Sequence, residues 1–202
     1  MITNLLLLIA LLLLAYIAGS INFSILVFKL LGKEDPRSAF SKNPGAFNVY
    51  RQAGKGWAAI VLILDMGRAA FISLLGLLVL PLQYLPWVAL VLILGNRFPC
   101  FHGFRGGKGV GNYLGFTAVL SPLAVGLSML VWLLIYKFAK EAFIGSFGML
   151  AVLALGTMAR CQWQPLAVAG TLATVGMIYF FHRTNVLQWL DKRRNAGRTN
   201  EA

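Results

Sequence analysis

The sequence predicts an all-α protein, a polytopic integral membrane bundle of about seven transmembrane helices, some of them short, in one domain over residues 1–202. Three observations predict this class. The chain is 59% hydrophobic and only 12% charged, whereas a soluble domain is about 45–50% apolar and about 25% charged. Its apolar residues form runs close to the roughly 20 residues that one membrane crossing requires. Its basic residues, which give a net charge of +12, lie between those runs in alternate loops.

The apolar runs define the expected helices in chain order. They cover residues 4–31, 57–81, 84–95, 113–136, 142–159 and 165–181. The first run contains a small polar patch at residues 19–24, for which we favour close helix packing over a function. The pair Ser121-Pro122 interrupts the fourth run. If this pair forms a turn, it separates short helices at 112–120 and 123–137 and gives seven crossings, whereas a kink would give six.

The basic residues set the orientation. They follow the first, third, fifth and last crossings of the seven-helix reading: Lys29, Lys33, Arg37, Lys42, Arg51 and Lys55; Arg97, Arg105 and Lys108; Lys137 and Lys140; Arg183, Lys192, Arg193, Arg194 and Arg198. The loops between carry almost no charge, and the positive-inside rule makes the basic side cytoplasmic. We therefore expect the N-terminus outside, the C-terminus in the cytoplasm, and residues 182–202 to include a basic cytoplasmic tail. Six crossings would put Lys137 and Lys140 on the wrong side.

Neither the first residues of the chain nor its cysteines suggest a secreted or metal-binding protein. Residues 1–4 lack the positive charge of a secretory signal, so we read the first helix as retained. Cys100 and Cys161 fall on opposite sides in this topology and should not pair, and neither has metal ligands at a useful spacing. We predict no metal site and no cofactor.

Two charged residues fall inside the second apolar run. Asp65 and Arg68 are three residues apart and share one helix face. An isolated charge is costly in lipid, so they should pair or face a polar interior. Two interpretations stay open, an ion pair that fixes helices together and a wall of a functional site.

Three segments on the predicted cytoplasmic side are rich in anion donors. The loop at residues 103–111 reads GFRGGKGVG, in which glycines can let backbone N–H groups converge on an anion while Arg105 and Lys108 add charge. Its Lys108-Gly109 end also suggests a helix N-terminus, itself an anion site. Residues 41–51 mix hydroxyl, amide and cationic groups, and His182 and Asn185 lie one helical turn apart. The glycine loop is not a Walker A motif, because Gly109 stands where Ser or Thr is required.

The motifs in these segments resemble those of the bacterial membrane acyl-phosphate:glycerol-3-phosphate acyltransferase family, PlsY. The similarity covers nearly the whole chain: Gly19-Ser20-Ile21-Asn22-Phe23; Ser41, Asn43, Gly45, Ala46, Asn48, Val49 and Arg51; Asp65 and Arg68; Pro99 through Val110; and His182, Arg183, Asn185 and Val186. Five positions depart from the family pattern, namely Phe40 and Lys42 in place of glycines, Phe47 in place of Thr, Asn96 in place of His, and Thr184 in place of Glu.

The resemblance implies a seven-helix fold that transfers an acyl group from acyl phosphate to the 1-hydroxyl of glycerol 3-phosphate and yields lysophosphatidate. It assigns site residues as follows: Ser41, Arg51, His182 and Asn185 as catalytic; Asn43, Gly45, Asn48, Arg105, Gly106, Gly107, Lys108 and Gly109 as substrate-binding; Asp65 and Arg68 as supporting. It places the protein in the bacterial inner membrane with these loops in the cytoplasm. Membrane lipids are the other expected partners, and nucleic acid is not one, since placement at a membrane surface explains the charge. Two alternatives remain, an anion transporter and a non-catalytic lipid-binding protein.

Overall fold

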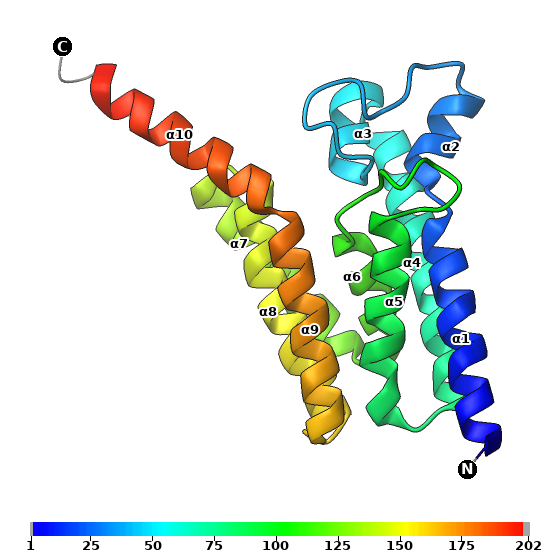
Figure 1. Ribbon diagram of the computed structural model, residues 1–202. Helices are drawn as coiled ribbons and strands as arrows, with labels where there is room; N and C mark the ends of the chain where they lie inside the picture. Colours follow the sequence, from blue (N-terminus) through cyan, green and yellow to red (C-terminus); the bar gives the residue numbers. More distant parts are fainter. Residues whose placement is uncertain (1, 200–202) are drawn as a thin grey trace.

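The computed structural model describes the backbone of residues 2–199, which is helical throughout with connecting loops and contains no strand in that range. The elements in chain order are α1 (Ile2–Ser20), α2 (Phe23–Leu30), α3 (Ala46–Ala53), α4 (Lys55–Val79), the short η1 (Leu82–Tyr84), α5 (Leu85–Arg97), α6 (Val110–Leu120), α7 (Pro122–Ala139), α8 (Ala142–Arg160), α9 (Pro165–Phe181) and α10 (Arg183–Thr199) (Figure 1). The predicted all-helical class is confirmed.

The helices pack as two groups, one that contains α1 and α4–α6 and one that contains α7–α9, and the two groups share one core. α1 packs along α5 and α4 packs along α6, while α7 packs along α8. The groups meet where α5 contacts α9 and α6 contacts α8. The shared core is built from fully buried side chains on helices of both groups, including Leu92 and Ile93 of α5, Phe116 of α6, Leu150 of α8 and Ile178 of α9. Many large apolar side chains lie on the outer faces, which suits a lipid surrounding.

Four stretches in the described part are long and apolar enough to cross a membrane. They are residues Leu5–Leu30, α4, α7 and α8, and the bent pair of α9 and α10 would be a fifth. α5 and α6 have 13 and 11 residues, so they are only about 20 and 17 Å long, short of the roughly 30 Å hydrocarbon layer. The count of seven crossings therefore stays a prediction.

Two breaks in the apolar runs shape the fold. The predicted turn is present, because α6 ends at Leu120 and α7 begins at Pro122, with Ser121 outside helical geometry between them. The first run, which we expected to be one continuous helix, is broken at residues 21–22. There the Asn22 side chain accepts a hydrogen bond from the Ile25 N–H and caps α2. This break frees the Ile21 carbonyl, which accepts a hydrogen bond from Arg68.

The patch before this break also contains a packing residue. A Cβ added to Gly19 would lie 2.1 Å from the Leu92 carbonyl oxygen, so glycine is what allows α1 to approach α5 closely. The polar patch therefore supports close packing at one end and a helix cap at the other.

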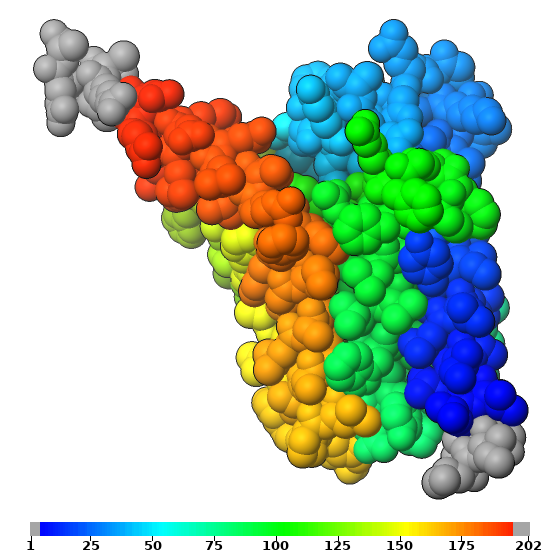
Figure 2. All heavy atoms as spheres, viewed as in Figure 1, coloured from blue at the N-terminus to red at the C-terminus, as the bar shows by residue number. Residues whose placement is uncertain are grey.

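The basic C-terminal segment is helical where the structure describes it. Its described part is the helix α10, which bends by 46° from α9 and projects away from the other helices (Figure 2). Our sequence interpretation included helical spacing only as far as Asn185, and the helix continues to Thr199.

Candidate functional site

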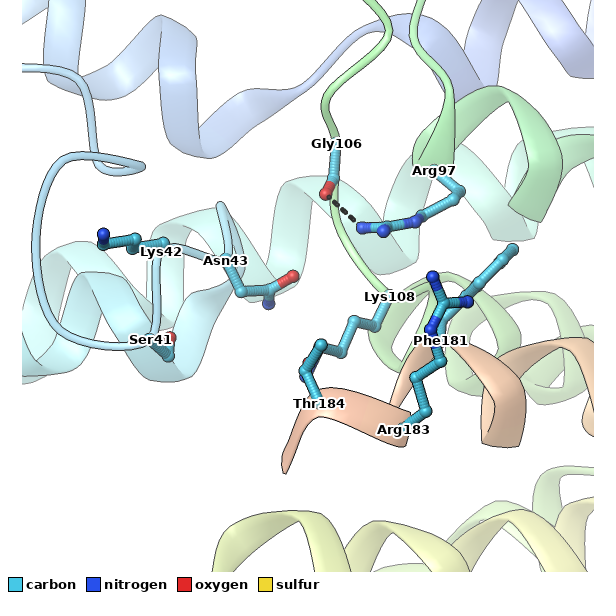
Figure 3. Close-up of a pocket in the computed structure, with 9 residues that line it drawn as sticks. All are labelled: Ser41, Lys42, Asn43, Arg97, Gly106, Lys108, Phe181, Arg183 and Thr184. Atoms are coloured by element: carbon cyan, nitrogen blue, oxygen red, sulfur yellow. Dashed lines mark hydrogen bonds between the residues drawn. The ribbon is translucent and has the colours of Figure 1, made fainter. Parts of the chain in front are cut away.

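A cavity of about 160 Å³ lies at the end of the bundle where the two polar loops meet the junction of α9 and α10. Nine residues line it (Figure 3), namely Ser41, Lys42, Asn43, Arg97, Gly106, Lys108, Phe181, Arg183 and Thr184. Four of these are cations, and no acidic residue is among them. Because the cations come from three separate segments, the fold concentrates positive charge here, and the cavity suits a small multivalent anion.

Lys108 is the half-buried cation that joins two of these segments. Its ammonium donates a hydrogen bond to the Asn185 side-chain oxygen. Burial lowers the pKa of Lys108 from 10.5 to about 8, and the neighbouring charge of Arg97 adds to the effect. The glycine loop and the segment of His182 and Asn185, which we expected on the same side of the membrane, are therefore in contact.

Arg97 is a cavity residue that our sequence interpretation did not include in the site. It is the last residue of α5, and its Nη1 donates to the Gly106 carbonyl oxygen at 3.3 Å. Its guanidinium also lies 5.1 Å from the centre of the Phe181 ring, and its buried Nε has no hydrogen-bond partner in the described part. The sequence signal that could have identified Arg97 was its position as a cation between an apolar run and the glycine loop.

The glycines of the loop act differently from the predicted anion nest. The N–H groups of Gly106 and Gly107 donate to the carbonyls of Arg97 and Asn96, each at 3.0 Å, so they are not free to converge on a ligand. A Cβ on Gly106 would lie 1.9 Å from the Asn96 carbonyl oxygen. These two glycines therefore allow the loop to lie against the end of α5.

Gly109 has a separate reason to be glycine. It is the residue before α6, and its φ of 91° lies in the left-handed region that glycine adopts without strain. The predicted helix N-terminus after Lys108 is present, since α6 begins at Val110.

The first polar loop divides into cavity residues and scaffold residues. Ser41 and Asn43 line the cavity, and the buried Oδ1 of Asn43 has no hydrogen-bond partner in the described part. Asn48 is buried and donates to the Pro36 carbonyl oxygen at 2.8 Å, so it holds the loop. Gly45 precedes α3, and Arg51 is exposed with its guanidinium 5.0 Å from the centre of the Phe47 ring, outside the cavity lining.

Two departures from the family pattern occupy unusual backbone geometry in the same loop. Phe40 and Lys42 have φ values of 52° and 53°, in the left-handed region that is costly for a residue with a side chain. The backbone therefore has the conformation that glycines at these positions would adopt easily. In Figure 3 the Lys42 ammonium points away from the other cations.

His182 lies beside the cavity at the end of α9. It is buried, its ring packs edge-on against Phe147, and its Nδ1 lies 2.9 Å from the Ile178 carbonyl oxygen. A carbonyl can only accept, so Nδ1 carries the proton and Nε2 of the neutral ring is left as an acceptor. His182 itself does not line the cavity, although the residues on either side of it do.

Three more predicted site residues lie away from the cavity. Arg105 is exposed and borders a second, more open depression with Asp35, Arg37 and His102, whereas the next residue, Gly106, lines the cavity. Asp65 and Arg68 form a buried ion pair with an N–O distance of 3.1 Å inside the bundle. Arg68 also donates to Asn112 of α6 and to the Ile21 carbonyl, and it thereby links three parts of the fold.

These features define a class of protein, a helical bundle of the integral membrane type with a cationic cavity at one end that suits a small anion. The sequence matches the glycerol-3-phosphate acyltransferase family over residues 9–192, and the chain belongs to that family.

Curated relatives and solved structures agree with this assignment. The glycerol-3-phosphate acyltransferases of Methylobacillus flagellatus and Pseudomonas aeruginosa are 36% and 35% identical to the chain, over 88% and 86% of it and 90% of each relative. The crystal structure of PlsY (YgiH), an integral membrane glycerol 3-phosphate acyltransferase in its glycerol 3-phosphate form, matches with a TM-score of 0.84 at 29% identity, over 92% of this chain and 93% of that one. The lysophosphatidic acid form of PlsY matches with a TM-score of 0.83.

Proposed function

We propose that this protein is a membrane acyltransferase that moves an acyl group from acyl phosphate to the 1-hydroxyl of glycerol 3-phosphate and releases lysophosphatidate and inorganic phosphate. The observation that carries the proposal is the cavity lined by four cations and no acid, in a chain whose relatives are named glycerol-3-phosphate acyltransferases. Both proposed substrates carry phosphate, which such a cavity would bind.

The proposed reaction places few demands on the protein beyond positioning. The 1-hydroxyl oxygen forms an ester bond to the acyl carbon, the bond from that carbon to the phosphate oxygen breaks, and the hydroxyl proton passes to a base. Acyl phosphate is already activated, so holding the two substrates in attack geometry supplies much of the rate. Arg97, Lys108 and Arg183 would hold phosphate groups and stabilise charge that develops on oxygen.

The remaining cavity residues would orient the acceptor. Ser41 and Asn43 offer a hydroxyl and a free amide oxygen to the glycerol hydroxyls, which agrees with their position in the lining. Nε2 of His182 is a proton acceptor next to the cavity, and Asn185 fixes the Lys108 ammonium through their hydrogen bond. We infer that His182 orients the attacking hydroxyl or accepts its proton.

We further propose that the protein crosses the bacterial inner membrane seven times with the cavity at the cytoplasmic face. The positive-inside rule supports this orientation, and α5 and α6 would be short crossings shielded by the longer helices that surround them.

The direct test uses purified protein in lipid with acyl phosphate and radiolabelled glycerol 3-phosphate. Labelled lysophosphatidate should form, and a Lys108→Ala variant with an unchanged melting temperature should form at least about 100-fold less, in the range seen when one transition-state donor is removed. No product from the wild type under conditions in which the Pseudomonas aeruginosa relative is active would refute the enzyme assignment. Uptake of glycerol 3-phosphate by proteoliposomes without product would favour the transporter alternative.

A further inference from the structure

The glycine loop is held from outside the cavity by one arginine of the first loop. Nη1 of Arg37 donates to two carbonyl oxygens of the loop between α5 and α6, to that of His102 at 2.8 Å and to that of Arg105 at 2.9 Å. Figure 1 shows these two long connections lying side by side at one end of the bundle. The Arg37 side chain is 26% exposed and does not line the cavity.

Asp35 fixes the orientation of the Arg37 guanidinium. Its carboxylate accepts from Nε at 2.9 and 3.0 Å and from Nη2 at 2.6 Å, and it also accepts from the Arg37 backbone N–H at 2.8 Å. These bonds use the edge of the guanidinium that faces away from the glycine loop, so Nη1 is aimed at the two carbonyls. A planar fork held on one side is already organised for contacts on the other.

The carbonyl of Arg105 belongs to the same planar peptide unit as the N–H of Gly106. That N–H donates to the Arg97 carbonyl at 3.0 Å, so this peptide plane is fixed at both ends, by Arg37 on one side and by the end of α5 on the other. The next plane is also fixed at both ends, because Arg97 donates to the Gly106 carbonyl and the Gly107 N–H donates to Asn96. Lys108 follows directly after these two planes.

We propose that Arg37 is a positioning residue for glycerol 3-phosphate, because it fixes the peptide plane from which the loop carries Lys108 into the cavity. The inference rests on the proposed function, in which Lys108 binds the phosphate of that substrate. Without Arg37 the Arg105–Gly106 plane has one anchor instead of two, and a displacement of about 1 Å at a binding group can cost up to about 100-fold in rate.

The test measures the KM of both substrates in four variants of the full-length protein in lipid. Arg37→Met removes the donors and retains much of the length, and it should raise the KM for glycerol 3-phosphate about tenfold or more while the KM for acyl phosphate changes less than about twofold. Arg37→Lys, whose ammonium can reach one carbonyl, should give an intermediate value. Asp35→Asn keeps one side-chain oxygen that can accept from the Arg37 guanidinium, so it should raise the KM less than Arg37→Met does, by less than about threefold.

Lys33→Met is the matched control, because it removes a cation from the same loop at an exposed position and should change neither KM. Equal increases in both KM values, or an unchanged KM for glycerol 3-phosphate in Arg37→Met, would overturn the positioning role. If Arg37→Met melts at a lower temperature, Arg37→Lys carries the same test. An inactive wild type would instead refute the proposed function, so the two failures can be told apart.

Discussion

Raising the pH above about 8 should weaken the binding of glycerol 3-phosphate, because Lys108 then loses its charge. Its pKa is lowered from 10.5 to about 8 by burial and by the charge of Arg97, and only the ammonium form attracts a phosphate dianion. A phosphate monoester has its second pKa near about 6, so the substrate stays a dianion throughout this range. The loss of glycerol 3-phosphate binding above pH 8 must then come from a change in the protein.

The expected magnitude follows from the fraction of protein that is still charged at Lys108. The apparent KM equals the intrinsic value divided by that fraction, which gives an increase of about twofold at pH 8 and about elevenfold at pH 9.

The contribution of Lys108 to stability should increase over the pH range in which substrate binding weakens. A folded-state pKa below the unfolded value means that the unfolded chain binds more protons between about pH 8 and 10.5, so the contribution of Lys108 to the free energy of unfolding increases with pH over that window.

The assay is the initial rate at saturating acyl phosphate, measured from about pH 6.5 to 9.5 with the melting temperature recorded at each pH. The matched variant is Lys108→Arg, whose guanidinium stays charged over the whole range and which should therefore show a nearly constant KM. A wild-type KM that is flat up to pH 9.5 would contradict the argument. So would a Lys108→Arg variant with the same slope as the wild type.

Three further predictions concern the backbone and the buried ion pair. Gly106→Ala should destabilise the protein by about 1–3 kcal/mol and lower activity, because its Cβ would lie 1.9 Å from the Asn96 carbonyl oxygen, whereas Gly56→Ala, with no atom within 4 Å, should do neither. Phe40→Gly should raise the free energy of unfolding by about 1 kcal/mol by relieving its left-handed backbone. Arg68→Met should cost about 3–5 kcal/mol by leaving Asp65 buried without its partner.

Thermal melting in detergent micelles measures all three effects, and each has an outcome that would count against it. Equal destabilisation by Gly106→Ala and Gly56→Ala would mean that the close contact with α5 is not the cause. Phe101→Gly is the control for Phe40→Gly, since Phe101 is also exposed but has no positive φ, and an equal stabilisation by both would remove the strain argument. The double variant Asp65→Leu with Arg68→Met should recover part of the loss, and no recovery would argue against the unpaired-charge mechanism.

The class of fold and the meeting of the polar loops could be predicted from the sequence because both depend on strong, local signals. Long apolar runs have few alternatives to membrane helices, and a Ser-Pro pair within such a run marks a break, as α6 and α7 show. Alternation of charge then placed the polar loops on one side, where Lys108 and Asn185 are in contact. Lys108 and Asn185 are 77 residues apart in the chain, and the predicted topology still placed them at the same end of the bundle.

The parts that sequence patterns did not show depend on contacts between segments. A glycine-rich loop predicts free N–H groups, but whether they are free depends on which carbonyls lie beside them. Here the Arg97 carbonyl accepts from the Gly106 N–H, and the Asn96 carbonyl accepts from the Gly107 N–H. Arg105 and Arg97 are both cations next to apolar helices, and only the path of the loop decides that Arg97 lines the cavity and Arg105 does not. The break at residues 21–22 was missed because the polar patch around it was interpreted as a packing surface, whereas Asn22 caps a new helix there.

The distribution of acidic residues gives the last reason to regard the cavity as a ligand site. Like charges that share a small volume repel one another, as the effect of Arg97 on the pKa of Lys108 shows, so a purely structural cluster of this kind should include neutralising carboxylates. Two carboxylates of the described residues are already paired with other arginines, Asp35 with Arg37 and Asp65 with Arg68. The fold thus pairs Arg37 and Arg68 with acids, whereas the lining of the cavity holds four cations and no acid. A bound dianion is the partner that would balance their charge.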